Sequence, residues 1–265
     1  MRIGFIGAGR MGAPMVSRLV GAGHHVRVLG RTDEKRLAVA QLGAVPVATT
    51  AEVTYAAEAV LVCVFTDEQV RQLCLDDDLI AGMPRGSALV LHTTGSPRTA
   101  EALAARAEAA GVAVIDAPVS GGPHDIAAGN VTLFVGGTPE AVGRVRPALA
   151  AYGDPILHVG PTGTGQRVKL INNTMFAGQI GLVAEAIKLG KSLGVPEQIL
   201  LDALPHGSGT SRALAGVVAR GSVAGFIDTA GAFVGKDVEV VRKVVAELGG
   251  ELGVLDDVVN AWLAT

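Results

Sequence analysis

Near its N-terminus the chain reads Gly4-Phe5-Ile6-Gly7-Ala8-Gly9-Arg10-Met11-Gly12. An apolar run leads into a GxGxxG pattern and an amphipathic stretch follows, which is the strand–turn–helix context that such a pattern needs to be informative. Gly7 permits a tight turn, Gly9 lets a pyrophosphate approach the backbone, and Gly12 lets the helix pack closely on the strand. The pyrophosphate then lies at a helix N-terminus, where N–H groups and the helix dipole favour negative charge. The stretch therefore predicts a dinucleotide site, with Arg10 and Met11 in its turn.

Alternating apolar and amphipathic segments extend this unit through the first half of the chain, as repeated βα units do. Strands are expected at Arg2–Ile6, His25–Leu29, Ala59–Val64, Ala88–His92, Ala113–Asp116, Val131–Val135 and Ile156–Val159. Helices are expected at Met11–Ala22, Asp33–Gln41, Arg98–Ala110 and Pro139–Tyr152. The pattern predicts a parallel sheet of the Rossmann type, a dinucleotide-binding α/β domain over residues 1–161.

The pattern of apolar and polar residues changes after Gly160-Pro161-Thr162-Gly163. A helical pattern runs from Gly165 to Leu193 and ends at Gly194 and Pro196. Further helices are expected at Glu197–Leu204, Ser211–Val218, Phe233–Leu248 and Asp256–Leu263. Residues 162–265 are therefore expected to form an all-α domain, joined to the first by one long helix.

The end of the second predicted strand bears on the choice of cofactor. An Asp or Glu there would accept a hydrogen bond from the ribose 2′-hydroxyl, but this chain has Gly30-Arg31-Thr32. Arg31 offers a planar cationic fork suited to a phosphate, and Thr32 adds a hydroxyl. We expect NADP rather than NAD; the alternative is that Arg31 is a solvated loop residue.

Composition excludes several classes of function. Apolar residues make up 49% of the chain and aromatic residues 3%, and the net charge of -3 comes without a basic block, which argues against nucleic-acid binding. The first strand begins near Arg2 and apolar runs reach only about ten residues, so we expect a cytoplasmic protein with no signal peptide and no membrane span. Cys63 and Cys74 have no metal-ligand spacing and are expected to be reduced thiols. Asp76-Asp77-Asp78 lacks the spacing of a calcium loop, so no metal site is expected.

The long helix carries the most informative polar residues of the second half. Lys169 and Asn173 are four positions apart, so they lie on one helix face and can point into one cleft. A lysine beside a substrate oxygen can move a proton once burial or a neighbouring cation makes it less basic, and an asparagine amide can hold a hydroxyl oxygen. The alternative is a solvated lysine on an amphipathic helix.

Together these motifs resemble those of the β-hydroxyacid dehydrogenase family, which includes 3-hydroxyisobutyrate dehydrogenase and short-chain semialdehyde reductases. The matching elements are Gly4–Gly12, the run Asp116-Ala117-Pro118-Val119-Ser120-Gly121-Gly122, Gly163-Thr164-Gly165 with Lys169, Asn172 and Asn173, and Lys236-Asp237. The family resemblance covers nearly the whole chain.

The resemblance implies a role for each motif. Ser120, Gly121 and Gly122 would hold the substrate carboxylate in an anion nest, Lys169 would exchange a proton with the substrate oxygen, and Asn173 would orient the substrate. The residues implied at the cofactor are Phe65, Thr66, Thr94 and Lys236. The alternatives are an ordinary turn for Ser120–Gly122 and a surface pair for Lys236-Asp237, while Asn172 is expected to be structural.

Three departures from the family pattern bear on the substrate. Asp125 follows the substrate turn and would disfavour an acidic substrate unless it points away. Leu91-His92-Thr93 replaces the acidic residue and small polar neighbours that are usual ahead of Thr94, and the chain ends at Thr265, about one helix earlier than relatives usually do. We therefore expect a larger or less acidic substrate, or a pocket completed by a partner subunit.

The favoured function is an NADP-dependent oxidoreductase that interconverts a small β-hydroxyacid and its semialdehyde. The alternatives are an imine reductase, which usually carries Asp or Tyr in place of Lys169, and a non-catalytic NADP-binding module. Gly165–Leu193 would span about 43 Å at 1.5 Å per residue, longer than one small domain needs. Its apolar positions Met175, Ile180, Val183 and Ile187 predict a homodimer, or a tetramer, through the helical domain.

Overall fold

The computed structural model of the protein describes residues 1–77 and 79–263 and separates into two compact units, residues 1–169 and 170–265. The division falls inside the long helix α8 (Thr164–Ser192), past the boundary placed at 161 from the sequence. Each unit is described by itself.

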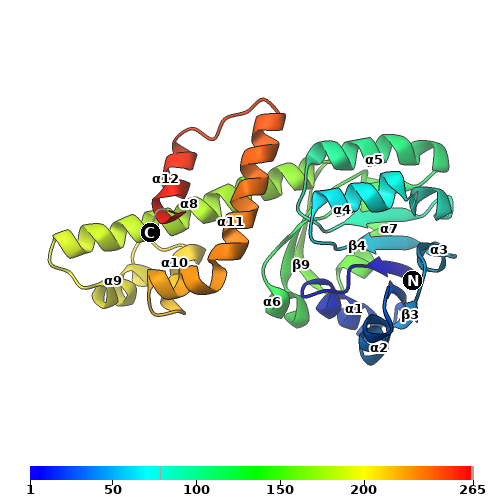
Figure 1. Ribbon diagram of the computed structural model, residues 1–265, viewed down its shortest axis with the longest axis horizontal. Helices are drawn as coiled ribbons and strands as arrows, with labels where there is room; N and C mark the ends of the chain where they lie inside the picture. The colour runs from blue at the N-terminus through cyan, green and yellow to red at the C-terminus, as the bar shows by residue number, and fades with distance from the viewer. Residues whose placement is uncertain (78, 264–265) are drawn as a thin grey trace. The chain divides into compact units, whose positions relative to one another are not determined.

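A twisted sheet with helices around it forms the centre of the first unit (Figure 1). Its strands in the described chain run in the order β3-β2-β1-β4-β5-β6-β8-β7. The first six of these pair in parallel with one another. This is the strand order of a Rossmann fold, so the fold class expected from the sequence is confirmed. Their bounds are β1 Arg2–Ile6, β2 His25–Leu29, β3 Val45–Val47, β4 Ala59–Val62, β5 Ala88–Leu91 and β6 Ala113–Asp116.

The remaining strands make the sheet mixed. β8 (Val131–Gly136) pairs antiparallel to β6 and to β7 (Val119–Ser120), and β9 (Gly153–Gly160) pairs parallel to β8. The expectation of a parallel sheet is therefore wrong at β8. The chain between β6 and β8 contains only β7 and the short helix α6 (Pro123–Ala128), and an antiparallel neighbour can be reached without a long crossover helix.

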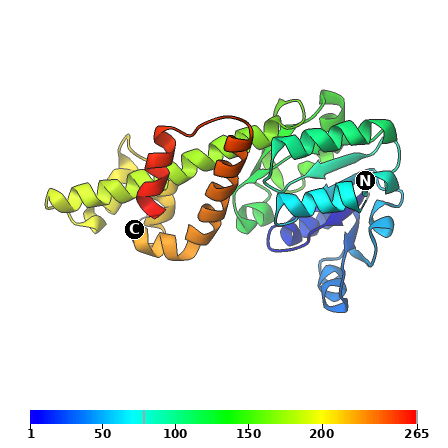
Figure 2. The same ribbon diagram turned by 45° about the horizontal axis from the view of Figure 1, so that its top comes forward.

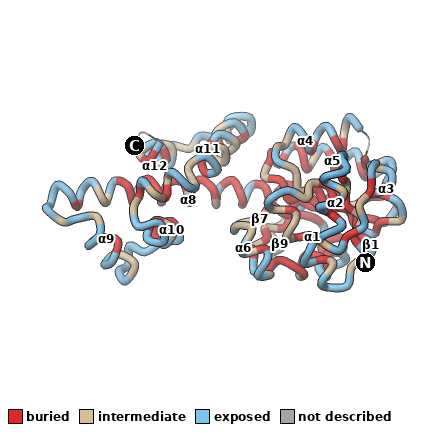
Figure 3. The backbone as a smooth tube through the Cα atoms, turned by 60° about the horizontal axis from the view of Figure 1, so that its bottom comes forward, coloured by how far each residue is buried: buried red, intermediate tan, exposed pale blue. Residues whose placement is uncertain are grey.

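Helices cover both faces of the sheet, and the side chains that point alternately to the two faces of the central strands β4 and β5 are all buried. Along β1, Phe5 belongs to the core beneath α1 and α7, whereas Ile6 belongs to the core beneath α3, α4 and α5. Figure 3 shows these strands as the buried interior of the unit. The helices are α1 Gly12–Gly21, α2 Asp33–Gln41, α3 Thr50–Thr54, α4 Asp67–Arg71, α5 Pro97–Ala110 and α7 Pro139–Leu149, with a π-helical turn at Gln72–Asp76 and a 3₁₀ turn at Leu79–Gly82.

Several of these elements have no counterpart in the sequence prediction: β3, α3, α4, α6, β7 and the two turns. They span two to six residues, which is too short for a hydrophobic period to show. Local caps define α3 and α4 instead. Thr49 with Glu52, and Thr66 with Gln69, form capping boxes at their first turns.

The described residues of the second unit, 170–263, form helices joined by loops and contain no strand, as expected (Figure 2). After α8 come α9 (Glu197–Ala203), a 3₁₀ turn at Leu204–His206, α10 (Arg212–Val218), α11 (Val223–Glu247) and α12 (Val254–Leu263). α11 begins ten residues before the predicted start at Phe233, because the Ser222 side chain accepts a hydrogen bond from Gly225 N–H at 3.0 Å and caps the helix there. Glycines at 225, 231 and 235 had weakened the helical pattern in the sequence.

Close packing of α12 on α8 depends on a glycine. A Cβ at Gly181 would lie 1.9 Å from the carbonyl oxygen of Val258, so no larger residue fits without moving α12. Trp262 of α12 is buried in the same core as Ile180 and Phe226. This core holds the part of α8 beyond Leu170.

Candidate active site

The turn between β1 and α1 has the shape that a pyrophosphate requires. Gly7 has a φ of 101°, and a Cβ there would lie 2.3 Å from the carbonyl oxygen of Cys63. A Cβ at Gly12 would lie 2.1 Å from the carbonyl oxygen of Gly7, whereas nothing in the described chain lies within 4 Å of the corresponding position at Gly9. Met11, at the N-cap of α1, makes no side-chain cap, and the first turn carries no acidic residue. The turn thus combines tight packing behind it with open backbone at Gly9, which fits a dinucleotide phosphate.

Several positively charged side chains lie just after the end of β2. Arg31 is exposed, and Thr32 caps α2 by accepting a hydrogen bond from Lys35 N–H at 3.3 Å. Arg36, which the sequence analysis did not single out, donates to the Gly30 carbonyl at 2.8 Å and pairs with Asp33. A Cβ at Gly30 would lie 2.7 Å from the Arg36 side chain, so Arg36 occupies the space that an acidic residue would need.

The loops after β4 and β5 meet at the same edge of the sheet, since both strands run parallel to β1. The Thr93 hydroxyl donates to the Val64 carbonyl at 2.9 Å and accepts from Val64 N–H at 3.1 Å, which fastens the two loops together. Phe65 is exposed beside this contact and Thr66 caps α4. Thr94 is half-buried. The structure thus brings these predicted cofactor residues to the carboxyl ends of neighbouring strands.

The predicted substrate turn lies at the end of β7. Gly121 has a φ of 139°, which favours glycine, and Ser120 is half-buried. The carboxylate of Asp125 accepts a hydrogen bond from Gly122 N–H at 2.6 Å, and a Cβ at Gly121 would lie 2.7 Å from the same carboxylate. Asp125 therefore points toward the turn and engages one of the donors expected for a substrate carboxylate.

Lys169 and Asn173 are both buried on α8, with 8% and 7% of their surface exposed. The Asn173 oxygen accepts from Asn172 Nδ2 at 3.4 Å, while its own Nδ2 is buried and has no hydrogen-bond partner among the described residues. A buried amide left without an acceptor costs about 1–3 kcal/mol, so such groups commonly mark a place where a polar ligand binds. Lys236 is half-buried on α11 in the second unit, and its expected place beside the cofactor stays a prediction.

A buried carboxylate accepts hydrogen bonds from the backbone at the N-terminus of α8, and the sequence analysis gave this carboxylate no role. Asp116, at the end of β6, accepts hydrogen bonds from Gly163 N–H at 2.6 Å and Gln166 N–H at 2.7 Å. Burial raises the pKa of this carboxyl, and the two N–H donors oppose the rise. The first turn of α8, which leads to Lys169, is thus fixed to the sheet.

His92 is also buried and stays neutral. Its Nδ1 bonds to the Ala117 carbonyl at 2.7 Å, and its Nε2 bonds to the Tyr152 hydroxyl at 2.8 Å. Burial lowers the pKa of His92 to about 4. These bonds require a proton on Nδ1, with Nε2 accepting from Tyr152. His92, the middle residue of the run that departs from the family pattern, therefore links β5, the segment after β6 and the loop before β9.

The described residues can also be searched for a disulfide, a metal site and a membrane span, none of which was expected from the sequence. Both cysteines are free, and burial raises the pKa of each thiol to about 12. Within residues 1–77 and 79–263 no three His, Cys, Asp or Glu side chains are grouped so that they could hold a metal ion; Asp78 lies outside that range. No single helix there is long and apolar enough to cross a membrane, although the bent pair α10 and α11 together meets the length and composition of a broken span.

Comparisons with known proteins agree with this arrangement. Residues 2–160 match the family model of the NAD-binding domain of 6-phosphogluconate dehydrogenase. Residues 163–265 match the NAD-binding domain model of NADP-dependent 3-hydroxyisobutyrate dehydrogenase. The chain is 36% identical to an NAD-dependent L-serine dehydrogenase of Pseudomonas aeruginosa over 80% of its own length and 72% of the relative.

Two solved structures extend the likeness. The first is Mycobacterium tuberculosis 3-hydroxyisobutyrate dehydrogenase with L-serine, at 30% identity and a TM-score of 0.88, with 100% of this chain and 94% of that one covered. The second is Psf3 in complex with NADP⁺ and 2-OPP, at 31% identity and a TM-score of 0.76, with 91% and 86% covered. The chain therefore belongs to the β-hydroxyacid dehydrogenase family of NAD(P)-dependent oxidoreductases.

Proposed function

We propose that this protein interconverts a small β-hydroxyacid and its semialdehyde with NADP, and that Lys169 moves the proton. The observation that carries the proposal is the pair of buried polar side chains one turn apart on α8, Lys169 and the partly unpartnered Asn173. A protein that only bound the dinucleotide would need the first unit alone. It would have no use for a buried lysine and a buried amide one turn apart on the helix that leads out of that unit.

The roles follow from the chemistry of each group. In the reducing direction the protonated Lys169 donates to the oxygen of the developing alkoxide; in the oxidising direction its neutral amine accepts the hydroxyl proton. Asn173 Nδ2 donates a hydrogen bond to the same substrate oxygen or its neighbour, which satisfies its buried N–H. The bound nicotinamide supplies or accepts the hydride. Ser120 and the backbone at Gly121 hold the substrate carboxylate.

The proposed preference for NADP rests on the cations after β2. Arg31 and Lys35 are exposed near the Thr32 cap, and Arg36 takes the place of an acidic side chain at Gly30. A 2′-phosphate would be attracted to this cluster, whereas a 2′-hydroxyl finds no acidic side chain at position 30 to accept from it. The Psf3 structure contains NADP⁺, but the L-serine dehydrogenase relative is NAD-dependent, so the cofactor has to be measured on this chain.

The test is a panel of matched substrates with purified protein. With NADP⁺, 3-hydroxyisobutyrate and L-serine are compared with 2-methyl-1,3-propanediol, in which the carboxylate of 3-hydroxyisobutyrate is replaced by a hydroxymethyl group. With NADPH, small carboxylated aldehydes are compared with uncharged aldehydes and cyclic imines. The proposal expects turnover that depends on the carboxylate. Preferred reduction of cyclic imines would favour the imine reductase alternative, and binding of NADPH with no turnover would favour a non-catalytic module.

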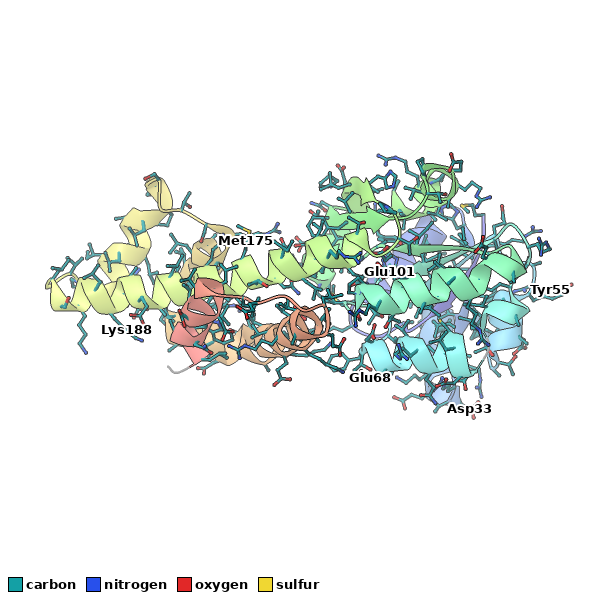
Figure 4. All side chains as sticks on the ribbon, turned by 90° about the horizontal axis from the view of Figure 1, so that it is seen from above. Asp33, Tyr55, Glu68, Glu101, Met175 and Lys188 are labelled. Atoms are coloured by element: carbon teal, nitrogen blue, oxygen red, sulfur yellow. The ribbon has the colours of Figure 1, made fainter. Side chains whose placement is uncertain are left out.

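We also propose a homodimer built through α8. Four large apolar residues lie within one narrow face of this helix and a fifth follows directly after its last residue, and each of the five is between 53% and 70% exposed: Ile171, Met175, Leu182, Leu189 and Leu193. Met175, on this face, is labelled in Figure 4. Their spacings of four and seven residues make a continuous stripe that a second copy could cover. Ile180, Val183 and Ile187, named from the sequence, instead pack in the core of the second unit.

Light scattering tests the dimer. Leu182→Glu puts a charge in the middle of the stripe and is expected to give a monomer, because a buried charge without a partner is unfavourable. Ile199→Glu, on an equally exposed apolar position of α9, is the matched control and should leave the dimer intact. A monomeric wild-type protein would contradict the proposal.

A further inference from the structure

The side chain of Gln166 joins the cofactor edge of the sheet to the helix that carries Lys169. Only 2% of Gln166 is exposed. Its Oε1 accepts a hydrogen bond from Gly95 N–H at 3.0 Å, and its Nε2 donates to the Thr93 carbonyl at 2.8 Å. Its backbone N–H is held by Asp116. The amide orientation is thus fixed by one acceptor and one donor, both in the backbone of a single loop.

The two bonded groups of that loop flank Thr94, the residue expected beside the nicotinamide ribose. Gln166 lies in the first turn of α8, and Lys169 follows three positions later on a neighbouring position of the same helix. All of these residues belong to the first unit. One side chain therefore sets the position of the Thr94 loop relative to the helical turn that leads to Lys169.

We propose that Gln166 is a positioning residue, which holds the Thr94 segment and Lys169 in the alignment that the reaction needs. The inference rests on the proposed roles of Thr94 and Lys169. This positioning requires a side chain that accepts a hydrogen bond at one terminal atom and donates a hydrogen bond from the other. A glutamine does so at every pH, a protonated glutamic acid does so as well, and a glutamate does not, because its second oxygen would face the Thr93 carbonyl.

This requirement gives a test that a purely structural role would not reproduce. Gln166→Leu removes both bonds and should lower kcat by about 100-fold, as small displacements of a catalytic group do. Gln166→Glu should be equally impaired at pH 8 but should recover toward the wild-type rate as the pH is lowered to 5.5, when each rate is divided by that of the wild type at the same pH. The control is Arg167→Gln, at the residue that follows Gln166 in the sequence. It removes an exposed ion pair between Arg167 and Glu101 and should keep the wild-type rate.

A second readout needs neither substrate nor cofactor. Hydrogen exchange at the Gly95 amide should be faster in Gln166→Leu than in the wild type, and in Gln166→Glu it should slow as the pH falls, after correction for the intrinsic exchange rate. If exchange behaves so but the wild type turns over no substrate, the link stands and the proposed function fails. Equal losses of rate in Gln166→Leu and Gln166→Glu at every pH, or wild-type rates in both, would overturn the positioning role.

Discussion

The carboxylate of Asp116 accepts a hydrogen bond from the backbone N–H of Gly163 over 2.6 Å, although the two residues are 47 positions apart. Its other oxygen accepts from Gln166 N–H at 2.7 Å. The residue at the end of β6 thus serves as the cap of α8, a function that a Ser, Thr, Asp or Asn next to the helix usually performs. The sheet that is expected to bind the cofactor therefore fixes the start of the helix that carries Lys169.

Replacement of Asp116 measures the strength of this link. Asp116→Ala leaves two buried N–H groups without an acceptor and is expected to lower the free energy of unfolding by about 1–3 kcal/mol. Urea denaturation would measure it, with Glu108→Ala, an exposed acidic residue on α5, as the control. Equal stabilities for the two variants would show that the cap contributes nothing.

Asp125 is expected to set the charge that the substrate turn tolerates. Asp125→Asn keeps an oxygen that can accept from Gly122 N–H but removes the negative charge beside Gly121. Relief of about 1 kcal/mol of repulsion would lower KM for a carboxylated substrate roughly fivefold, with KM for NADPH unchanged. Glu140→Gln, an exposed acidic residue on α7, is the control. An unchanged KM in Asp125→Asn would place the substrate carboxylate elsewhere.

Arg31 is expected to distinguish the two cofactors. Arg31→Ala should weaken NADPH binding about 10-fold, because a charge-assisted bond to the 2′-phosphate is lost, and should leave NADH binding within about twofold. Fluorescence titration of both cofactors on both proteins measures the difference. A wild-type protein that binds NADH more tightly than NADPH would contradict the assignment of this loop.

His92 predicts how stability depends on pH. Its pKa is about 4 in the folded protein and near 6.5 in the unfolded chain, so between these values the unfolded chain binds a proton that the folded one does not. The contribution of neutral His92 to the free energy of unfolding is fully present above pH 6.5 and is lost as the pH falls toward 4. The loss is about 1.4 kcal/mol for each unit of the pKa difference.

Urea unfolding at pH 7.5, 6 and 5 would show this loss in the wild type. His92→Gln removes the titrating group, so its unfolding free energy should fall less steeply over the same range. Parallel slopes for the two proteins would mean that His92 does not control the loss.

Local patterns let most of the fold be predicted. The GxGxxG turn, the strand at Ala113–Asp116 and the long helix from Gly165 follow from hydrophobic period and glycine spacing, and the structure has them within a residue or two. The reversed direction of β8 could not be predicted, because strand direction depends on pairing between distant segments. Short capped helices such as α3 could not be predicted, because they are too short to show a full period of the hydrophobic pattern.

The site divides in the same way. Lys169 and Asn173 were singled out by their residue types and spacing, and the Ser120–Gly122 turn by its resemblance to the family motif; their roles stay predictions. Asp116 and Gln166 were given no role, because the groups they bind are distant in the sequence: the partners of Gln166 lie 71 and 73 positions away. One sequence alone does not show which distant backbone groups a buried amide will meet.

The most direct test of the account is the role of Lys169 itself. We would measure kcat/KM for NADPH-dependent reduction of a small carboxylated semialdehyde by the wild type and by Lys169→Ala, together with NADPH affinity by fluorescence titration. The account predicts a loss of about 10²–10⁴-fold in kcat/KM, the usual contribution of a general acid, with NADPH affinity unchanged. A Lys169→Ala variant that turns over at the wild-type rate would contradict it.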